Sequence, residues 1–252
     1  MGANGYDLFW MLARTEFRMR DQGTFLGFLW SLLLPLFQFA ILYAIFTRWM
    51  GGRIENYAAY LLIGIVQWNL FSAGTTHGLT SLRRKAGLVS NFNFPSVFVP
   101  LSSTVAVLAS HVFEWIVLFC ALFALGIEPR WSWLLLPVPV AFAFLLTVGV
   151  ACVLAFAAVR IRDLDHVWSV FLYGLFFATP IFYSPDIVGG VGKILLTWNP
   201  LSILIGATRA LVMGGSAPSP TAIVATALFS ITIAGAGIIL SPRRGGDVAE
   251  VL

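Results

Sequence analysis

Six stretches of the chain are apolar over about the length that a helix needs to cross a lipid bilayer, and polar or charged segments separate them. They are Phe28–Thr47, Ala58–Leu79, Ser96–Gly126, Trp133–Val159, Val167–Tyr183 and Thr221–Leu240. About 20 apolar residues span the hydrocarbon core, so the third stretch has room for tilt and the fifth is short. The pattern predicts an all-α integral membrane protein with six transmembrane helices, in a single transmembrane domain over residues 1–252.

Composition agrees with lipid as the surrounding solvent, since 59% of the 252 residues are hydrophobic and only 10% are charged. A polytopic chain of this length leaves little room for a separate soluble domain. Several charged residues lie early in the N-terminal segment, which argues against a cleavable signal peptide. Cys120 and Cys152 both fall in apolar stretches, and we expect them to act as small core hydrophobes.

Lysine and arginine gather on one side of the predicted membrane, and this asymmetry sets the orientation. Ten lie in the N-terminal segment, the second and fourth connections and the C-terminal segment: Arg14, Arg18, Arg20, Arg83, Arg84, Lys85, Arg160, Arg162, Arg243 and Arg244. Five lie in the other connections: Arg48, Arg53, Arg130, Lys193 and Arg209. Both termini are therefore predicted to be cytoplasmic.

The outer segment 184–220 contains an apolar run, Ile194–Met213, that is long enough for a seventh span. Asn199-Pro200 breaks the helix within this run, and Arg209 lies near its end. Broken backbone at membrane depth is tolerated only where protein covers it or where it lines a cavity. We therefore expect a re-entrant pair of short helices that enters from the outer side.

The segment Tyr6–Arg20, within residues 1–27, mixes aromatic, apolar and charged residues before the first apolar stretch. Such a mixture is typical of an amphipathic helix lying in the membrane interface. The alternative is a basic flank that only sets the topology.

The second cytoplasmic connection, residues 81–95, has a basic first half and an apolar, aromatic second half. Its candidate docking residues are Arg83, Arg84, Lys85, Leu88, Phe92 and Phe94. This pattern favours a short helix that inserts into a groove on a partner protein. A simple topology signal is the alternative.

His111 and Glu114 lie one helical turn apart in the third apolar stretch, where ionisable groups are expensive. We expect a hydrogen-bonded structural pair that faces the bundle interior. The alternative is a proton relay in a proton- or ion-coupled carrier or channel. No other carboxylate lies within an apolar stretch, so no metal site is predicted.

Two further patterns resemble reactive sites but do not predict one. Asp163 and Asp165 would suit an integral-membrane transferase, yet their basic neighbours at a membrane boundary favour salt-bridged packing, and no catalytic residue is predicted. The run 189–193 resembles a phosphate loop, but its spacing is short and Ile194 replaces the required Ser or Thr. We expect this chain to bind no cofactor, so that any ATP and Mg²⁺ used in transport would be bound by another subunit.

Aromatic side chains make up 15% of the chain and include two groups at helical spacing. Tyr173, Phe176 and Phe177 share a face of the fifth stretch, and Trp30 and Phe37 share a face of the first. Aromatic rings stack on sugar rings, so these residues are candidates for lining a glycan path. Ordinary packing or a position in the interfacial belt is the alternative.

The order and spacing of several short motifs along the whole chain resemble the membrane subunit of the ABC-2 type transporters that export O-antigen, teichoic acid and capsular polysaccharide. The motifs are Arg20 with Leu26-Gly27, Trp30 and Pro35; Tyr60-Leu61-Leu62-Ile63-Gly64 with Trp68 and Phe71; Leu88-Val89, Phe94-Pro95 and Pro100; Arg162-Asp163 with His166; and Tyr183-Ser184-Pro185 with Asn199-Pro200-Leu201 and Arg209. The chain departs from the family at two places. Asp21-Gln22 stands where the family often has Tyr and a basic residue, and Ser90-Asn91 stands where it often has two lysines.

The resemblance implies a half-channel in the inner (cytoplasmic) membrane of a bacterium. Two copies would pair, two nucleotide-binding ATPase subunits would dock on the cytoplasmic connections, and a polysaccharide carried on polyprenyl diphosphate would move outward. Arg14, Arg18 and Arg20 would lie where the diphosphate headgroup waits, since Arg binds phosphate through two parallel hydrogen bonds. No nucleic-acid partner is expected.

Overall fold

The computed structural model describes residues 5–19, 29–92, 94–239 and 241, and the regular structure in these ranges is helical throughout. The helices are α1 (Gly5–Met19), α2 (Leu29–Met50), α3 (Tyr57–Arg84), α4 (Ala86–Asn91), α5 (Phe98–Ala124), α6 (Pro137–Arg160), α7 (Leu164–Phe177), α8 (Gly190–Trp198), α9 (Pro200–Met213) and α10 (Pro220–Ile239), with short 3₁₀ helices η1 (Trp131–Leu135) and η2 (Pro185–Ile187). The predicted all-α class is confirmed for the described residues.

Helix α3 forms the centre of the bundle and packs against α2, α5, α6, α7 and α9. It packs most extensively against α6, where a Cβ on Gly78 would lie 2.5 Å from the Cβ of Ala151. The hydrophobic effect does little to drive helix association in lipid, so helices associate largely through close van der Waals packing, which small residues at the interface permit. Gly78 therefore allows the central helix to pack closely against α6.

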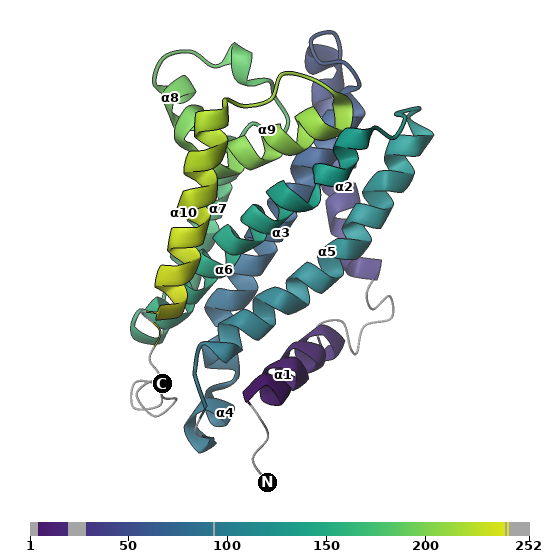
Figure 1. Ribbon diagram of the computed structural model, residues 1–252. Coiled ribbons are helices and arrows are strands. Elements are labelled where there is room, and N and C mark those ends of the chain that lie inside the picture. Colours follow the sequence, from purple (N-terminus) through teal and green to yellow (C-terminus); the bar gives the residue numbers. More distant parts are fainter. Residues whose placement is uncertain (1–4, 20–28, 93, 240, 242–252) are drawn as a thin grey trace.

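The two ends of the bundle carry different elements, as Figure 1 shows. The N-terminal helix α1, the short α4 and the end of α10 lie at one end, whereas α8 lies at the other. The first of these is the end predicted to be cytoplasmic. The expected N-terminal helix is present as α1, and it packs along α5.

Among the described residues, four helical segments are long and apolar enough to cross a membrane: Leu32–Met50, Phe98–Ala124, Trp131–Arg160 and Pro220–Ile239. Helix α3 has 28 residues but carries polar side chains such as Gln67, which its central position buries. Helix α7 has only 14 residues. The total of six spans therefore stays a prediction.

Helix α7 ends at Phe177 rather than at the predicted Tyr183. Pro180 explains the difference, because proline lacks an amide hydrogen and disfavours helical geometry in the residue before it. The break expected at Asn199-Pro200 is present: Asn199 caps α9, and α8 and α9 meet at an angle of 74°. The re-entrant course of this pair stays a prediction.

The expectation for the cysteines holds for one of the two. Cys152 is buried in α6, whereas Cys120 lies exposed on α5. An apolar span has a surface as well as an interior, so composition alone does not place a small side chain in the core.

Candidate functional site

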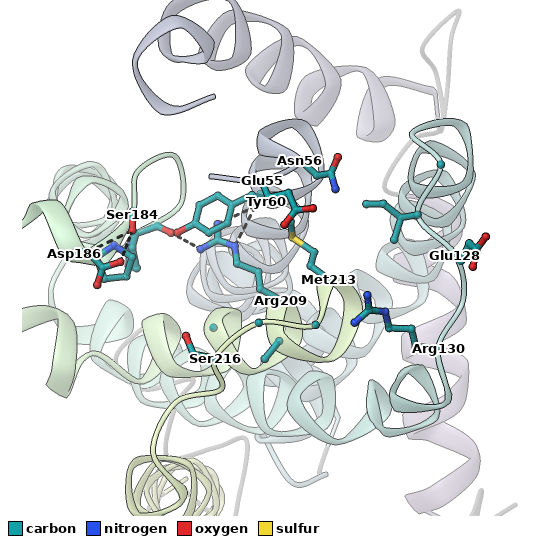
Figure 2. A pocket seen from close by; sticks show the side chains of 18 of the residues that line it. Glu55, Asn56, Tyr60, Glu128, Arg130, Ser184, Asp186, Arg209, Met213 and Ser216 are labelled. Atoms are coloured by element: carbon teal, nitrogen blue, oxygen red, sulfur yellow. Dashed lines mark hydrogen bonds between the residues drawn. The ribbon is translucent and has the colours of Figure 1, made fainter. Parts of the chain in front are cut away.

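The irregular segment 178–184, which follows α7, is held by a buried arginine from α9. Arg209 Nη1 donates to the carbonyl of Pro180 at 2.7 Å, and Nη2 donates to the carbonyl of Ile181 at 2.8 Å. Nε and Nη2 also donate to the carbonyl of Tyr60, at 3.1 and 2.9 Å. The residue is 7% exposed, and Figure 2 shows its guanidinium beside Tyr60.

Three more side chains bond the same segment. The hydroxyls of Tyr57 and Tyr60 donate to the carbonyls of Phe182 and Tyr183, at 2.8 and 2.9 Å. Asn199 Nδ2 donates to Thr179 Oγ1 at 2.9 Å and to a neighbouring carbonyl. Buried backbone groups outside a helix need such partners. We call Tyr57, Tyr60, Asn199 and Arg209 the outer cluster.

A glycine on α3 makes room for this arrangement. A Cβ on Gly64 would lie 2.5 Å from Arg209 Nη2 and 3.0 Å from the carbonyl oxygen of Ile181. Any side chain there would displace the guanidinium from its carbonyls. Gly64 therefore lets α3 approach both α9 and the irregular segment.

A cavity of about 610 Å³ opens beside the outer cluster (Figure 2). Four separate segments line it, within residues 55–60, 126–130, 180–186 and 206–216. The wall near the end of α9 is fixed by the α5–α6 connection, where Ser132 Oγ and Trp133 Nε1 donate to the carbonyls of Leu211 and Val212, at 2.6 and 3.2 Å.

At the opposite end of α3, Glu16 of α1 joins three elements. Its carboxylate lies 2.5 Å from Lys85 Nζ and 3.9 Å from an Arg84 nitrogen, and it accepts a hydrogen bond of 3.3 Å from Ser103 Oγ of α5. Burial raises the pKa of Glu16, but Lys85, Arg84 and Ser103 outweigh this effect and hold the pKa below its ordinary value. We call Glu16, Arg84, Lys85 and Ser103 the cytoplasmic cluster, after the side predicted for this end of the bundle.

Comparison with known proteins identifies the family. A family profile described as ABC-2 type transporter matches residues 7–213, which is most of the chain. The chain belongs to this family.

Named relatives of this transporter subunit align over most of their length. An O-antigen export system permease protein RfbA of Klebsiella pneumoniae is 28% identical over 211 residues, covering 83% of this chain and 82% of that protein. The RfbA permease of Myxococcus xanthus is 28% identical over 241 residues, covering 95% and 93%. The polysialic acid transport protein KpsM of Escherichia coli is 22% identical over 240 residues, covering 91% and 90%.

The predicted docking connection of the ABC-2 subunit contains a short helix, α4, as expected. Phe92 is 62% exposed, Leu88 is half-buried, and Phe94 is 6% exposed and packs with Leu12 and Val99. Phe94 therefore supports the fold of this chain, which the sequence pattern did not distinguish from a surface role.

The basic residues of this connection make contacts within the chain. Arg83 Nη1 donates to the carbonyl of Arg162 at 2.9 Å, and Nη2 lies 3.4 Å from Asp165 Oδ1. The salt-bridged packing expected for Asp165 is thus confirmed. Arg84 and Lys85 belong to the cytoplasmic cluster, so all three cations help to position α1, α3 and α7.

The predicted headgroup residues Arg14 and Arg18 lie exposed on α1, four residues apart and therefore on one face. Glu16 points instead toward Lys85. Arg20 lies outside the described residues. The sequence placed these charges in one segment. It did not show that the arginines face outward from α1 while the carboxylate of Glu16 faces the bundle.

The predicted aromatic stripe on α7 is divided between two environments. Tyr173 is 74% exposed and Phe177 is 61% exposed. Phe176 turns inward, with its ring centroid 5.4 Å from that of Trp68 and 5.8 Å from that of Phe182. Phe176 therefore contributes to the core.

On α2, Phe37 is exposed and the side chain of Trp30 lies outside the described part of the structure. The predicted alignment of Trp30 and Phe37 with the α7 rings consequently stays a prediction. The exposed candidates that the structure does place are Phe37, Tyr173 and Phe177.

The predicted pair of His111 and Glu114 is present on α5. His111 Nδ1 lies 3.2 Å from Glu114 Oε2, and Trp115 Nε1 donates to His111 Nε2 at 2.9 Å. An indole nitrogen only donates, so His111 Nε2 accepts and the hydrogen lies on Nδ1, directed at Glu114. Both ring nitrogens are thereby used in fixed contacts, which favours the structural interpretation over a proton relay.

Proposed function

We propose that this chain is the permease half-channel of an ATP-driven exporter. It moves a polyprenyl-diphosphate-linked polysaccharide, such as O-antigen, teichoic acid or capsule, from the cytoplasm to the outer face of a bacterial inner membrane. The observation that carries the proposal is the alignment over 95% of the chain with a protein named as an O-antigen export permease. The relative named for polysialic acid transport supports the broader substrate class.

ATP hydrolysis belongs to a separate subunit in this proposal. The sequence holds no complete phosphate loop, since Ile194 follows Lys193 where Ser or Thr is required. Two ATPase copies dock at the cytoplasmic end, where the exposed Phe92 directly follows α4. An exposed aromatic residue behind a short helix suits insertion into a groove on a partner.

A second copy of the chain completes the channel. Phe37 on α2, with Tyr173 and Phe177 on α7, lies exposed on a single chain. Rings of this kind stack on the C–H faces of successive sugars and release them, whereas a wall of charges would hold a polymer too tightly. Phe177→Ala is expected to slow export while leaving assembly intact. Unchanged export by this variant would show that the translocation path does not pass Phe177.

The diphosphate headgroup binds at the cytoplasmic end beside α1. Arg14 and Arg18 lie exposed on one face of this helix, and guanidinium groups bind phosphate oxygens in pairs. Arg18→Ala is expected to weaken binding of polyprenyl diphosphate in vesicles, whereas Arg48→Ala at the other end is the control. Equal binding by both variants would contradict this placement.

The topology is six crossings with cytoplasmic termini. Single cysteines at Ala217 and Ala249, in a chain lacking Cys120 and Cys152, should then label from opposite sides of the membrane. Labelling from the same side would contradict the proposed crossing number.

Deletion and complementation test the function itself. Removing this gene from its own cells should leave the lipid-linked glycan inside, and restoring the chain should return it to the surface. Glycan that reaches the surface at the normal rate without the chain would overturn the proposal.

A further inference from the structure

The cavity at the outer end of the bundle has the size and construction of a ligand site. Its volume of about 610 Å³ lies within the roughly 300–1,000 Å³ typical of small-molecule sites. Figure 2 shows Ser184 and Asp186 on one side of Arg209, and Glu128 and Arg130 on the other. These residues come from segments that are distant in sequence, so the fold as a whole builds the cavity.

The polar groups of the wall are mainly acceptors. Glu55 and Asp186 supply carboxylates, and Ser184 Oγ donates to Asp186 at 3.0 Å and leaves the other oxygen of that carboxylate available. The Glu128 side chain points away from Arg209 (Figure 2). The donors of Arg209 are directed at backbone carbonyls. Arg130 is therefore the main charged donor of the cavity wall.

Apolar surface lies between these acceptors. Ile127, Pro129, Pro185 and Met213 line the same cavity. A sugar ring presents hydroxyl donors at its edge and C–H groups on its faces, which this combination of carboxylates and apolar surface matches. A uronic acid would place its own carboxylate beside those of Glu55 and Asp186.

One wall of the cavity is rigid by construction. Gly214 ends α9 with a φ of 72°, and a Cβ at this position would overlap the guanidinium of Arg130. Only glycine adopts this backbone conformation freely and leaves the space empty. Arg130 is thus seated against the end of α9, beside the bonds that Ser132 and Trp133 make to the same helix.

We propose that this cavity binds one or two units of a neutral or amine-bearing saccharide at the outer face of each protomer. That the natural ligand is the exported glycan rests on the proposed function. The site is formed by a single chain, and it is separate from the exposed rings of α2 and α7.

Glycine substitutions test the site without removing any side chain of the wall. Gly215 lines the cavity, and a Cβ added there meets no atom within 4 Å, so Gly215→Trp fills the space. Gly52 is exposed and equally open but is not part of the cavity wall. Gly52→Trp is therefore the matched control.

The binding experiment uses the purified chain in nanodiscs and titration calorimetry. The probes are maltotriose, the glucosamine trisaccharide and trigalacturonate. We expect the first two to bind and the acidic probe to bind at least about tenfold more weakly. Gly215→Trp abolishes binding and Gly52→Trp retains it. Absence of binding, equal binding of trigalacturonate, or binding that survives Gly215→Trp would each overturn the proposal.

A carboxylate variant adds a second check. Glu55→Gln removes one charged acceptor of the wall and should weaken the glucosamine trisaccharide about tenfold. Asp163→Asn, which changes an exposed acid at the cytoplasmic end, should have no effect. Equal affinity of both variants would count against the assigned wall.

Export in cells separates this inference from the proposed function. If the unmodified chain restores glycan export but shows no saccharide binding, the cavity proposal fails alone. If the chain binds the probes through the cavity but does not restore export, the proposed function fails and the binding site stands.

Discussion

The guanidinium of Arg209 lies over the ring of Tyr60, 3.3 Å from the ring centroid. The carbonyl of Tyr60 also accepts from two nitrogens of the same arginine. Cation–π attraction and charge-assisted hydrogen bonds therefore act between one pair of residues. This contact joins α9 to α3 and also holds the irregular segment after α7.

Arg209→Met is expected to destabilise the fold by more than about 3 kcal/mol, because it leaves several buried carbonyls without donors. Arg209→Lys should recover only part of this loss, since a single ammonium group does not reproduce the planar fork of donors. Thermal unfolding in nanodiscs measures both. Arg48→Met, at an exposed position on α2, is the control. An Arg209→Met variant as stable as this control would contradict the structural role assigned to Arg209.

The ion pair of Glu16 with Lys85 predicts a pH-dependent stability. The folded pKa of Glu16 lies below its ordinary value of 4.5, so the stabilisation is fully present above pH 4.5 and is lost as pH falls through the lowered folded value. Glu16→Gln should cost about 1–3 kcal/mol at pH 7, and the difference from wild type should shrink below pH 4.5. Unfolding curves across pH measure the difference.

Exchanging the two charges tests whether the pair itself is responsible. Glu16→Lys combined with Lys85→Glu should be more stable than either single variant, because the attraction returns. A double variant that simply sums the two losses would show that the residues act independently.

Glu114→Gln is expected to preserve export at all pH values where the complex is stable. The amide oxygen of Gln accepts the Nδ1 hydrogen of His111 as the carboxylate does, so a structural hydrogen bond survives the change. A proton relay does not survive it. Initial export rates in vesicles, with thermal unfolding as a folding check, distinguish the two, and loss of export from a fully assembled variant would support proton coupling.

Phe92 and Phe94 form a matched pair of substitutions in the docking connection. Phe92→Ala removes an exposed ring and should leave folding intact while uncoupling ATP turnover from export. Phe94→Ala opens a cavity among Leu12, Val99 and Ala155 and should cost about 3–5 kcal/mol. Normal coupled export by Phe92→Ala would contradict a docking role for Phe92 beside α4.

Local patterns predicted those features that depend on neighbouring residues. Hydropathy located the helices, Asn199-Pro200 located the break between α8 and α9, and the three-residue spacing located the bond between His111 and Glu114. The period of a helix also grouped the α7 rings, but it did not show that Phe176 faces Trp68 while Phe177 faces outward. In a uniformly apolar helix the hydrophobic pattern carries little information about which face is buried.

The outer cluster and the cytoplasmic cluster could not be predicted from the sequence. Their members bind either residues that are distant in sequence or backbone groups, which are the same in every residue type. Lys85 meets Glu16 only through the packing of α1 along the bundle. Arg209 binds backbone carbonyls, which every residue possesses. Sequence marked Arg209 as a charge near a membrane boundary, and only the fold shows that it stabilises unwound backbone.

Reconstitution tests the central claim most directly. Proteoliposomes would contain this chain and its nucleotide-binding subunit, with lipid-linked glycan on the side where ATP is supplied, and glycan reaching the opposite leaflet would be measured over time. The account predicts transfer that requires both subunits and ATP hydrolysis, and that continues when the proton gradient is collapsed. Transfer without the ATPase subunit, or transfer that stops when the gradient collapses while ATP turnover continues, would contradict it.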